Sequence, residues 1–207
     1  MCKDTGMSEM PLEPDSPDDD EAYSSKDWRT DGGSHLEMMI DRASWPAADV
    51  DLADERLRLA TDTVCEMFDW PRLMVGGLLC DNHRIASLNA QFRGKDSPTN
   101  VLSFPSGETE PDDSGCLPAG DIAIAFETVR DEAARDAKHL QDHLTHLWVH
   151  GLLHLMGHDH LEDEEAEAME AGEIAVLARL GIADPYADPY DGLDQGGDAD
   201  NMQAGGK

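Results

Sequence analysis

Six of the nine histidines in this 207-residue chain fall within one stretch, HLTHLWVHGLLHLMGHDH at 143–160. His150 and His154 are four residues apart, so on a helix both imidazoles project from one face and can reach one metal ion. Gly157 can adopt the left-handed conformation that ends a helix and reverses the chain. This reversal would bring His160 back toward the first two histidines as a third ligand. The spacing therefore predicts a metal site made of three histidines.

This ligand set indicates a catalytic site that holds one zinc ion per chain. Three histidines leave one position of a tetrahedral zinc ion open for water, whereas structural sites use four protein ligands. Zinc bound in this way lowers the pKa of its water to about 7. Two residues of the turn, His158 and Asp159, are candidates to support the ligands, because a carboxylate there can accept a hydrogen bond from a ligand imidazole. Asp159 is equally well suited to stabilising the turn alone.

The same spacing, with its glycine, occurs in metzincin proteases, so a zinc protease is an alternative function. Those enzymes have a glutamate directly after the first histidine, where it acts as a general base. This chain has Gly151 at that position, which can neither accept nor deliver a proton. The sequence therefore disfavours proteolysis. His143 and His146, earlier in the stretch, are not needed as ligands, and we expect both at the surface.

The histidine stretch lies within a predicted domain of about residues 35–183, in which strands and helices are mixed. Apolar spacing predicts strands at 35–41, 73–80, 99–104 and 120–126, and helices at 50–68, about 84–92, 127–156 and 162–180. Asp51 is the expected N-cap of the first helix, the third helix is expected to break near 138–142, and Leu180-Gly181 ends the last. Because these elements form no regular βαβ repeat, we expect an α+β fold with a small mixed β-sheet packed against helices.

The net charge of −30 is unusual for a protein that binds nucleic acid, because phosphate is normally bound by basic surfaces. The two ends carry part of it: residues 1–34 hold ten acidic against three basic residues, and residues 184–207 hold six against one. Neither end has an apolar period, so we expect both to be disordered. The run at 161–173 adds seven acidic residues and no basic one. We interpret it as the solvated face of a helix.

Cysteine use and the length of the apolar runs favour a cytoplasmic protein. The four cysteines include no Cys-x-x-Cys pair, and the first residues do not have the apolar core of a secretory signal. The longest apolar runs, such as LMVGGLLC at 73–80, are shorter than the roughly 20 residues that a membrane span needs. We therefore expect reduced cysteines and no association with a membrane.

Three blocks of the sequence together resemble the YbeY family of bacterial endoribonucleases. They are LNAQFRGKDSPTNVLSFP at 88–105, GDIAIA at 120–125 and HGLLHLMGHDH at 150–160. They occur in the family's order, and the resemblance covers roughly residues 36–180. It implies an α+β fold and a metal-dependent endoribonuclease specific for single-stranded RNA. The implied substrate is ribosomal RNA, especially the 3′ end of the 16S rRNA, with roles in ribosome maturation and quality control.

By its position in the first block, Arg93 matches the family's functionally important arginine. A guanidinium can hold a phosphodiester oxygen in a bidentate grip and stabilise charge that develops in the transition state. Without the resemblance, an arginine at the end of a helix could as well cap the helix carbonyls. Lys95 is the nearest further cation. One residue departs from the family: Asn100 stands where aspartate is usual, which keeps the hydrogen-bonding shape and loses the charge.

The sequence thus predicts zinc on the three histidines, with Arg93 holding the scissile phosphate in a cleft between the sheet and the metal-binding helix. It leaves open whether water or the adjacent ribose 2′-OH attacks. The expected partners are single-stranded RNA, above all rRNA, and the ribosome or a ribosomal protein that supplies positive charge. Neither DNA nor a membrane is expected. The rival interpretation is a non-catalytic ribosome-assembly factor in which zinc only stabilises the fold.

Overall fold

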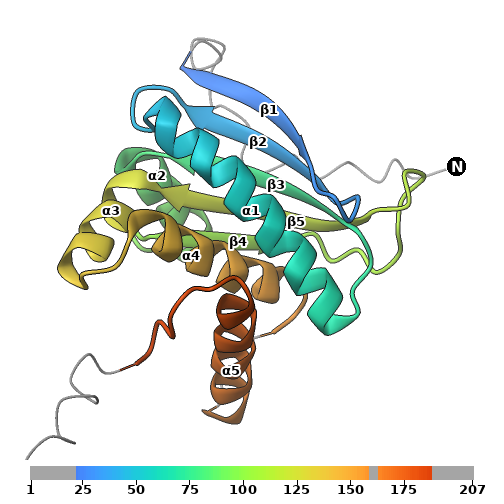
Figure 1. Cartoon of the computed structure of the whole chain (residues 1–207). Coiled ribbons are helices and arrows are strands. Elements are labelled where there is room, and N and C mark those ends of the chain that lie inside the picture. Colours follow the sequence, from blue (N-terminus) through green and yellow to red (C-terminus); the bar gives the residue numbers. More distant parts are fainter. Residues whose placement is uncertain (1–21, 159–162, 188–207) are drawn as a thin grey trace, which may run out of the picture.

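The computed structural model describes residues 22–158 and 163–187 (Figure 1). The described strands are β1 (Tyr23–Arg29), β2 (His35–Asp41), β3 (Leu73–Cys80), β4 (Val101–Pro105) and β5 (Leu117–Ala125). The described helices are α1 (Ala47–Phe68), α2 (Asn82–Arg93), α3 (Phe126–Arg135), α4 (Leu140–Leu155) and α5 (Asp163–Arg179). The predicted break in the third helix is confirmed slightly earlier than expected: α3 ends at Arg135, α4 begins at Leu140, and Ala137 between them has a positive φ of 52°.

The strands form one mixed sheet in the order β1-β2-β3-β5-β4. β2, β3 and β5 run parallel in the middle, while β1 and β4 pair antiparallel with their neighbours at the two edges. β3 lies at the centre, which explains its unbroken apolar run, because a central parallel strand is covered on both faces. The predicted α+β fold with a small mixed sheet is confirmed.

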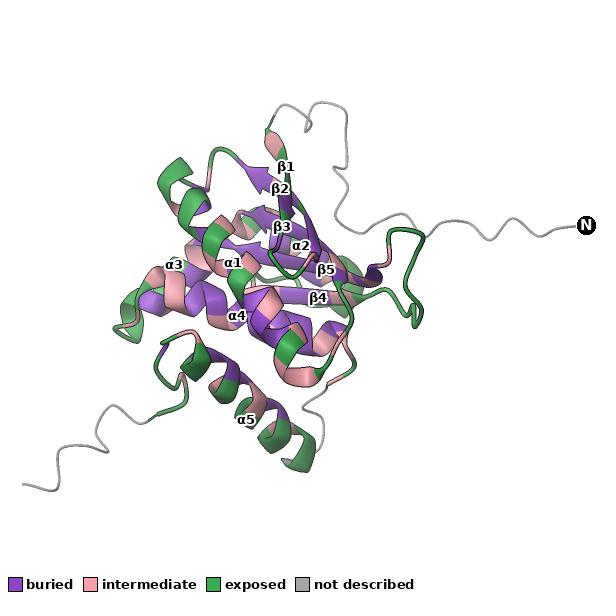
Figure 2. Ribbon diagram, turned by 45° about the vertical axis from the view of Figure 1, so that its right-hand side comes forward, coloured by how far each residue is buried: buried purple, intermediate pink, exposed green. Residues whose placement is uncertain are grey.

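Helices cover both faces of the sheet (Figures 1 and 2). α1 and α4 lie on one face over a large buried cluster that includes Leu36, Ile122 and Trp148. α2 lies on the other face over a smaller cluster that includes Ile85 and Ala123. Neighbouring strand residues such as Ile122 and Ala123 join opposite clusters because side chains alternate across a sheet. α5 packs against α1 and α4, and no helix of the described segments is long and apolar enough to cross a membrane.

The helix ends position the segments that carry the predicted site. α2 begins at the N-cap Asp81, whose carboxylate accepts a hydrogen bond from the backbone N–H of Arg84 at 2.7 Å. It ends at Gly94, which has a φ of 68°. The prediction that Asp51 caps α1 is wrong, because α1 already begins after Pro46. Proline suits the start of a helix because its φ is fixed and the N–H it lacks has no partner there.

The expectation that all of residues 1–34 are disordered is wrong from residue 22 onward. β1 pairs with β2 along its whole length, and Trp28 is only 4% exposed. The following turn is closed by a hydrogen bond of 2.8 Å from the N–H of Ser34 to Oγ1 of Thr30. The sequence does not reveal this strand, because an edge strand can be held by backbone pairing and the residues SSKD at 24–27 provide no apolar pattern.

The C-terminal end was also expected to be disordered, beginning at residue 184. Pro185 and Tyr186 instead contact the domain: Nζ of Lys138 donates a hydrogen bond to the carbonyl of Pro185 at 3.0 Å, and the hydroxyl of Tyr186 donates to Glu173. The remainder of both expected tails, 1–21 and 188–207, lies outside the described residues. The boundary of the folded domain is therefore wider at both ends than the sequence predicts.

Candidate metal and phosphate site

Helix α4 brings two of the three predicted metal ligands together. The rings of His150 and His154 are edge to face with centroids 4.6 Å apart, and their Nε2 atoms are 3.1 Å apart. The other side of α4 is enclosed in the core, where Trp148, Leu152 and Leu153 are completely buried. The two histidines therefore project from a helix whose position is fixed by packing.

The hydrogen bonds of both rings determine which nitrogen carries the proton. Nδ1 of His150 lies 2.8 Å from Oε1 of Glu173, and Nδ1 of His154 lies 3.0 Å from the carbonyl oxygen of His158. A carboxylate and a carbonyl can only accept hydrogen bonds, so each Nδ1 carries a hydrogen, and Nε2 is the nitrogen through which either ring can bind a metal. Two imidazoles whose Nε2 atoms converge are a donor set that zinc takes in proteins.

The distance between the two Nε2 atoms also fits one shared metal ion. Two nitrogens bound at about 2.0–2.1 Å to a tetrahedral zinc ion lie about 3.3 Å apart, close to the 3.1 Å between His150 and His154. The third predicted ligand, His160, lies outside the described residues, as does Asp159. Within residues 22–158 and 163–187, no group of three metal-binding side chains is found. The described part of the site is therefore the pair of helix histidines.

The chain turns after α4 at the glycine that the spacing singled out. Gly157 has a φ of 88°, and the N–H of His158 donates to the carbonyl of Leu153 at 3.0 Å. The predicted reversal at Gly157 is confirmed. His158 contacts the site through its backbone, because its carbonyl is the partner of His154, while its ring packs edge-on against Phe68.

Glu173 of α5 is the site residue that sequence reasoning missed. It ends the acidic run that was expected to be solvated, yet it is only 1% exposed. Oε1 accepts a hydrogen bond from His150, and Oε2 accepts from Nε2 of His146 at 2.8 Å and from the hydroxyl of Tyr186 at 2.5 Å. Burial by itself raises the pKa of this carboxyl, but the three hydrogen bonds outweigh burial and hold the pKa of Glu173 at about 2. A stable anion therefore lies behind the predicted metal ligands.

The expectation that His143 and His146 lie at the surface is wrong. Their side chains are 7% and 12% exposed, and each pairs with a carboxylate through Nε2: His143 with Glu132 at 2.9 Å, and His146 with Glu173. Burial lowers the pKa of His143, and the hydrogen bond with Glu132 opposes this shift. The histidines of α4 thus form a row at helical spacing in which each ring is held by a partner.

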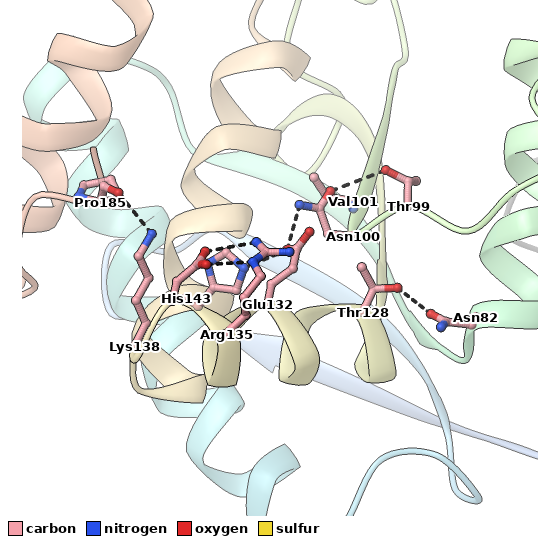
Figure 3. Close-up of polar contacts among 11 residues, drawn as sticks. Asn82, Thr99, Asn100, Val101, Thr128, Glu132, Arg135, Lys138, His143 and Pro185 are labelled. Atoms are coloured by element: carbon pink, nitrogen blue, oxygen red, sulfur yellow. Dashed lines mark hydrogen bonds and ion pairs between the residues drawn. The ribbon is translucent and has the colours of Figure 1, made fainter. Parts of the chain in front are cut away.

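Asn100, where the YbeY pattern usually has aspartate, ties β4 to α3 (Figure 3). Its Nδ2 donates to Oε2 of Glu132 at 3.0 Å, and its Oδ1 accepts from the backbone N–H of Val101 at 2.8 Å. The same oxygen of Glu132 accepts the hydrogen bond from His143. An aspartate at position 100 would set two carboxylates against each other. The amide therefore suits this chain, because it donates to the carboxylate that holds the first histidine of the row.

Arg93, the predicted phosphate-binding residue, is the last residue of α2 and is exposed. Its Nη2 lies 3.5 Å from the carbonyl oxygen of Ser103 in β4. The end of α2 is capped by the backbone N–H of Gly94, so Arg93 is not needed to cap the helix carbonyls. Beside it, the ring of Phe92 is 46% exposed and contacts Phe104 edge-on. A guanidinium and an aromatic ring thus share one exposed site at the end of α2.

Strand β4 borders both Arg93 and α4. Ser103 pairs with Ile122 of β5, and Ile122 packs against Gly151 of α4, where an added Cβ would lie 2.9 Å from Cδ1 of Ile122. α4 also packs directly against β4. Gly151 is therefore a close helix–sheet contact, at the position where metzincin proteases have their catalytic glutamate. A side chain at position 151 would require Ile122 or α4 to shift.

Several known proteins are similar to this chain over most of its length. The family model described as Endoribonuclease YbeY matches residues 48–181. "Endoribonuclease YbeY" of Jannaschia sp. (strain CCS1) is 45% identical over 159 residues, which are 73% of this chain and 99% of the relative. The protein of the same name from Ruegeria pomeroyi is 50% identical over 142 residues, which are 62% of this chain and 86% of the relative. The solution structure of TM1509 from Thermotoga maritima is 24% identical, covers 69% of this chain and 96% of that chain, and has a TM-score of 0.44.

Proposed function

The chain belongs to the YbeY family, and on that basis we propose that it is a zinc-dependent endoribonuclease that cuts single-stranded RNA. The observation that carries the proposal is the convergence of Nε2 of His150 and Nε2 of His154 at 3.1 Å, with both tautomers fixed by acceptors at Nδ1. The relatives are named as endoribonucleases, which supports RNA as the substrate class.

His150 and His154, with His160 as the third ligand, are the residues that would hold the metal. When bound there, zinc supplies a Lewis acid and lowers the pKa of water to about 7. The residues of the chain orient the ligands: Glu173 and the carbonyl of His158 keep a proton on each Nδ1 and fix the plane of each ring. The core side of α4 keeps the spacing of the two rings constant.

In this proposal Arg93 holds the scissile phosphate. Its hydrogen bond to Ser103 is long, so the exposed guanidinium can turn to grip a phosphodiester with two hydrogen bonds. The neighbouring ring of Phe92 offers a surface on which an unpaired base can stack, whereas the bases of a duplex are already paired and stacked. Lys95 adds a second cation close to Arg93 in the chain. This combination favours single-stranded RNA.

The finer part of the proposal is that the RNA is the 3′ end of 16S rRNA, processed during ribosome maturation and quality control in the cytoplasm. The net charge of −30 gives indirect support. Affinity for bare RNA grows with the number of phosphates that a protein neutralises, and an acidic protein neutralises few. The ribosome or a ribosomal protein would supply positive charge, and we expect neither DNA nor a membrane as a partner.

A second candidate function is a ribosome-assembly factor that binds its target without cutting, which the acidic composition favours. Such a protein would need zinc only for folding. The large cluster between the sheet and helices α1 and α4 is apolar and needs no metal to form. Structural zinc sites also use four protein ligands, against the three predicted here. The endoribonuclease is therefore the better supported of the two functions.

Cleavage of an unstructured RNA oligonucleotide by the zinc-loaded, full-length protein tests the proposal. We expect the wild type to cut, and Arg93→Ala and His154→Ala to cut much more slowly with unchanged circular dichroism. Arg130→Ala is a matched control, since Arg130 is an exposed arginine of α3 that pairs with Asp131. A folded, zinc-loaded wild type that cuts no RNA would leave the assembly factor as the function. Products that end in a 2′,3′-cyclic phosphate would identify the ribose 2′-OH as the attacking group.

A further inference from the structure

The chain that follows α5 returns to the metal-binding helix (Figure 1). We call residues 184–186 the C-terminal strap. Lys138, in the turn between α3 and α4, donates from Nζ to the carbonyl of Pro185 at 3.0 Å (Figure 3). The ring of Tyr186 stands edge-on to the ring of His146, with centroids 5.6 Å apart. The strap therefore lies against the row of buried histidines in α4.

Tyr186 connects this surface segment to the carboxylate behind the metal ligands. Tyr186 is 45% exposed, yet its hydroxyl donates at 2.5 Å to Oε2 of Glu173, a residue that is 1% exposed. Oε1 of the same carboxylate accepts the hydrogen bond from Nδ1 of His150 at 2.8 Å. The two oxygens of a carboxylate are rigidly joined, so a hydrogen bond that holds one oxygen also determines where the other points.

We infer that Tyr186 is a positioning residue of the metal site: its hydroxyl holds the carboxylate of Glu173, which in turn orients the ring of His150. The inference rests on the proposed function, in which His150 binds zinc. Without the hydroxyl, Oε2 keeps the hydrogen bond from His146, but the carboxylate gains freedom to rotate and water can replace the lost donor. The ring of His150 is then held less firmly, and the site binds zinc less tightly.

The zinc affinity of full-length Tyr186→Phe, measured by competition with a chromophoric chelator, tests this inference. The substitution removes the hydroxyl and keeps the ring against His146. We expect affinity to fall about three- to tenfold, less than the roughly 10–100-fold loss that follows when a direct partner of a ligand, such as Glu173, is replaced. The melting temperature of the metal-free protein is the second readout. A merely structural role would lower that temperature and leave zinc affinity unchanged.

Two variants serve as controls. Tyr23→Phe makes the same chemical change in β1, at the edge of the sheet opposite β4. It should keep wild-type zinc affinity. Lys138→Met frees the strap from the turn before α4 but leaves the hydroxyl of Tyr186 in place, so it should weaken zinc binding less than Tyr186→Phe does.

The possible outcomes separate this inference from the proposed function. Equal zinc affinity of the wild type and Tyr186→Phe would overturn the inference and leave the function intact. A loss in Lys138→Met as large as that in Tyr186→Phe would assign the effect to the strap as a whole, and would also overturn the role of the hydroxyl. A wild type that binds no zinc would overturn the inference and the zinc-dependent function together.

Discussion

The two faces of the sheet each have a buried carboxylate, and the surroundings of the two differ. Glu173, on the side of α4, accepts three hydrogen bonds and has a pKa of about 2. Asp121 of β5 precedes Ile122 and so lies on the side of α2, where it is 6% exposed. Burial, with a smaller contribution from Glu37, raises the pKa of Asp121 to about 6. The surroundings of Glu173 therefore stabilise its buried charge, and those of Asp121 do not.

The residues proposed to act on RNA also differ in how firmly their surroundings hold them. The rings of His150 and His154 are half-buried and oriented by their acceptors, so these ligands are in place without substrate. Arg93 and Phe92 are exposed, and the hydrogen bond from Arg93 to the sheet is long at 3.5 Å. The predicted metal half of the site is therefore preorganised, whereas the substrate itself must complete the proposed phosphate half.

The largest effect is expected from removing a preorganised ligand. His154→Ala should abolish tight zinc binding and lower the cleavage rate about a thousandfold, because a metal ion contributes several kcal/mol to the transition state and about 1.4 kcal/mol corresponds to a factor of ten. Elemental analysis and single-turnover cleavage measure the two effects. A His154→Ala protein that keeps zinc and full activity would show that the helix pair is not the metal site.

A smaller effect is expected on the substrate side. Arg93→Ala should lower the cleavage rate about a hundredfold, as the loss of one transition-state donor does in other enzymes. Zinc content should stay unchanged. Arg93→Lys should restore only part of the rate, because lysine cannot form the bidentate grip. Full recovery with lysine would mean that a point charge is sufficient and that the geometry of the guanidinium has no role.

The metal side was also the part of the site that local sequence could predict. The convergence of His150 and His154 and the reversal at Gly157 follow from the geometry of one helix and its end, and the structure has both features. Arg93 has no such local pattern. Its assignment depended on the family resemblance, and only the fold shows that it lies beside Ser103 at the edge strand β4.

Hydrogen-bond partners and strands that come from distant parts of the chain could not be predicted from local sequence. Glu173 lies 23 residues from His150 and inside an acidic run, so its charge suggested solvent exposure. One signal was present: Met169 and Leu177, four residues before and after it, are both buried, which places Glu173 on the buried face of α5. β1 was missed for another reason, because the backbone pairing that holds an edge strand leaves little trace in the side chains.

A smaller effect again is expected on RNA affinity, from the exposed ring of Phe92. Phe92→Ala should weaken binding of a single-stranded oligonucleotide about tenfold, since stacking a base on an aromatic ring contributes about 1–3 kcal/mol. Fluorescence anisotropy measures this. Leu52→Ala is a matched control, because Leu52 is an equally exposed apolar residue on α1. If both variants bind RNA as tightly as the wild type does, no base stacks on Phe92. RNA binding at this part of the site would then depend on Arg93 and not on the ring.

The smallest effect is expected from the buried carboxylate on the α2 side. The pKa of Asp121 in the folded protein, about 6, lies above its ordinary value of 3.8. Below the ordinary value both states are protonated, so the shift costs no stability. As pH rises toward 6 the unfolded chain loses its proton first, and the folded state becomes relatively less stable; above 6 the loss is complete. Asp121→Asn stays neutral, so it should be more stable than the wild type by about 1–2 kcal/mol at pH 8, after allowance for solvent screening.

Urea unfolding at pH 8 and at pH 4 measures this difference, and the advantage of Asp121→Asn should nearly vanish at pH 4. The matched change on the other face is Glu173→Gln in the metal-free protein. It replaces an anion that accepts three hydrogen bonds, so at pH 8 it should destabilise the fold where Asp121→Asn stabilises it. Opposite signs for the two amides would confirm that Glu173 and Asp121 differ in how their surroundings hold a buried charge. The same sign for both would mean that burial alone governs the two carboxylates and that the hydrogen bonds to Glu173 contribute little.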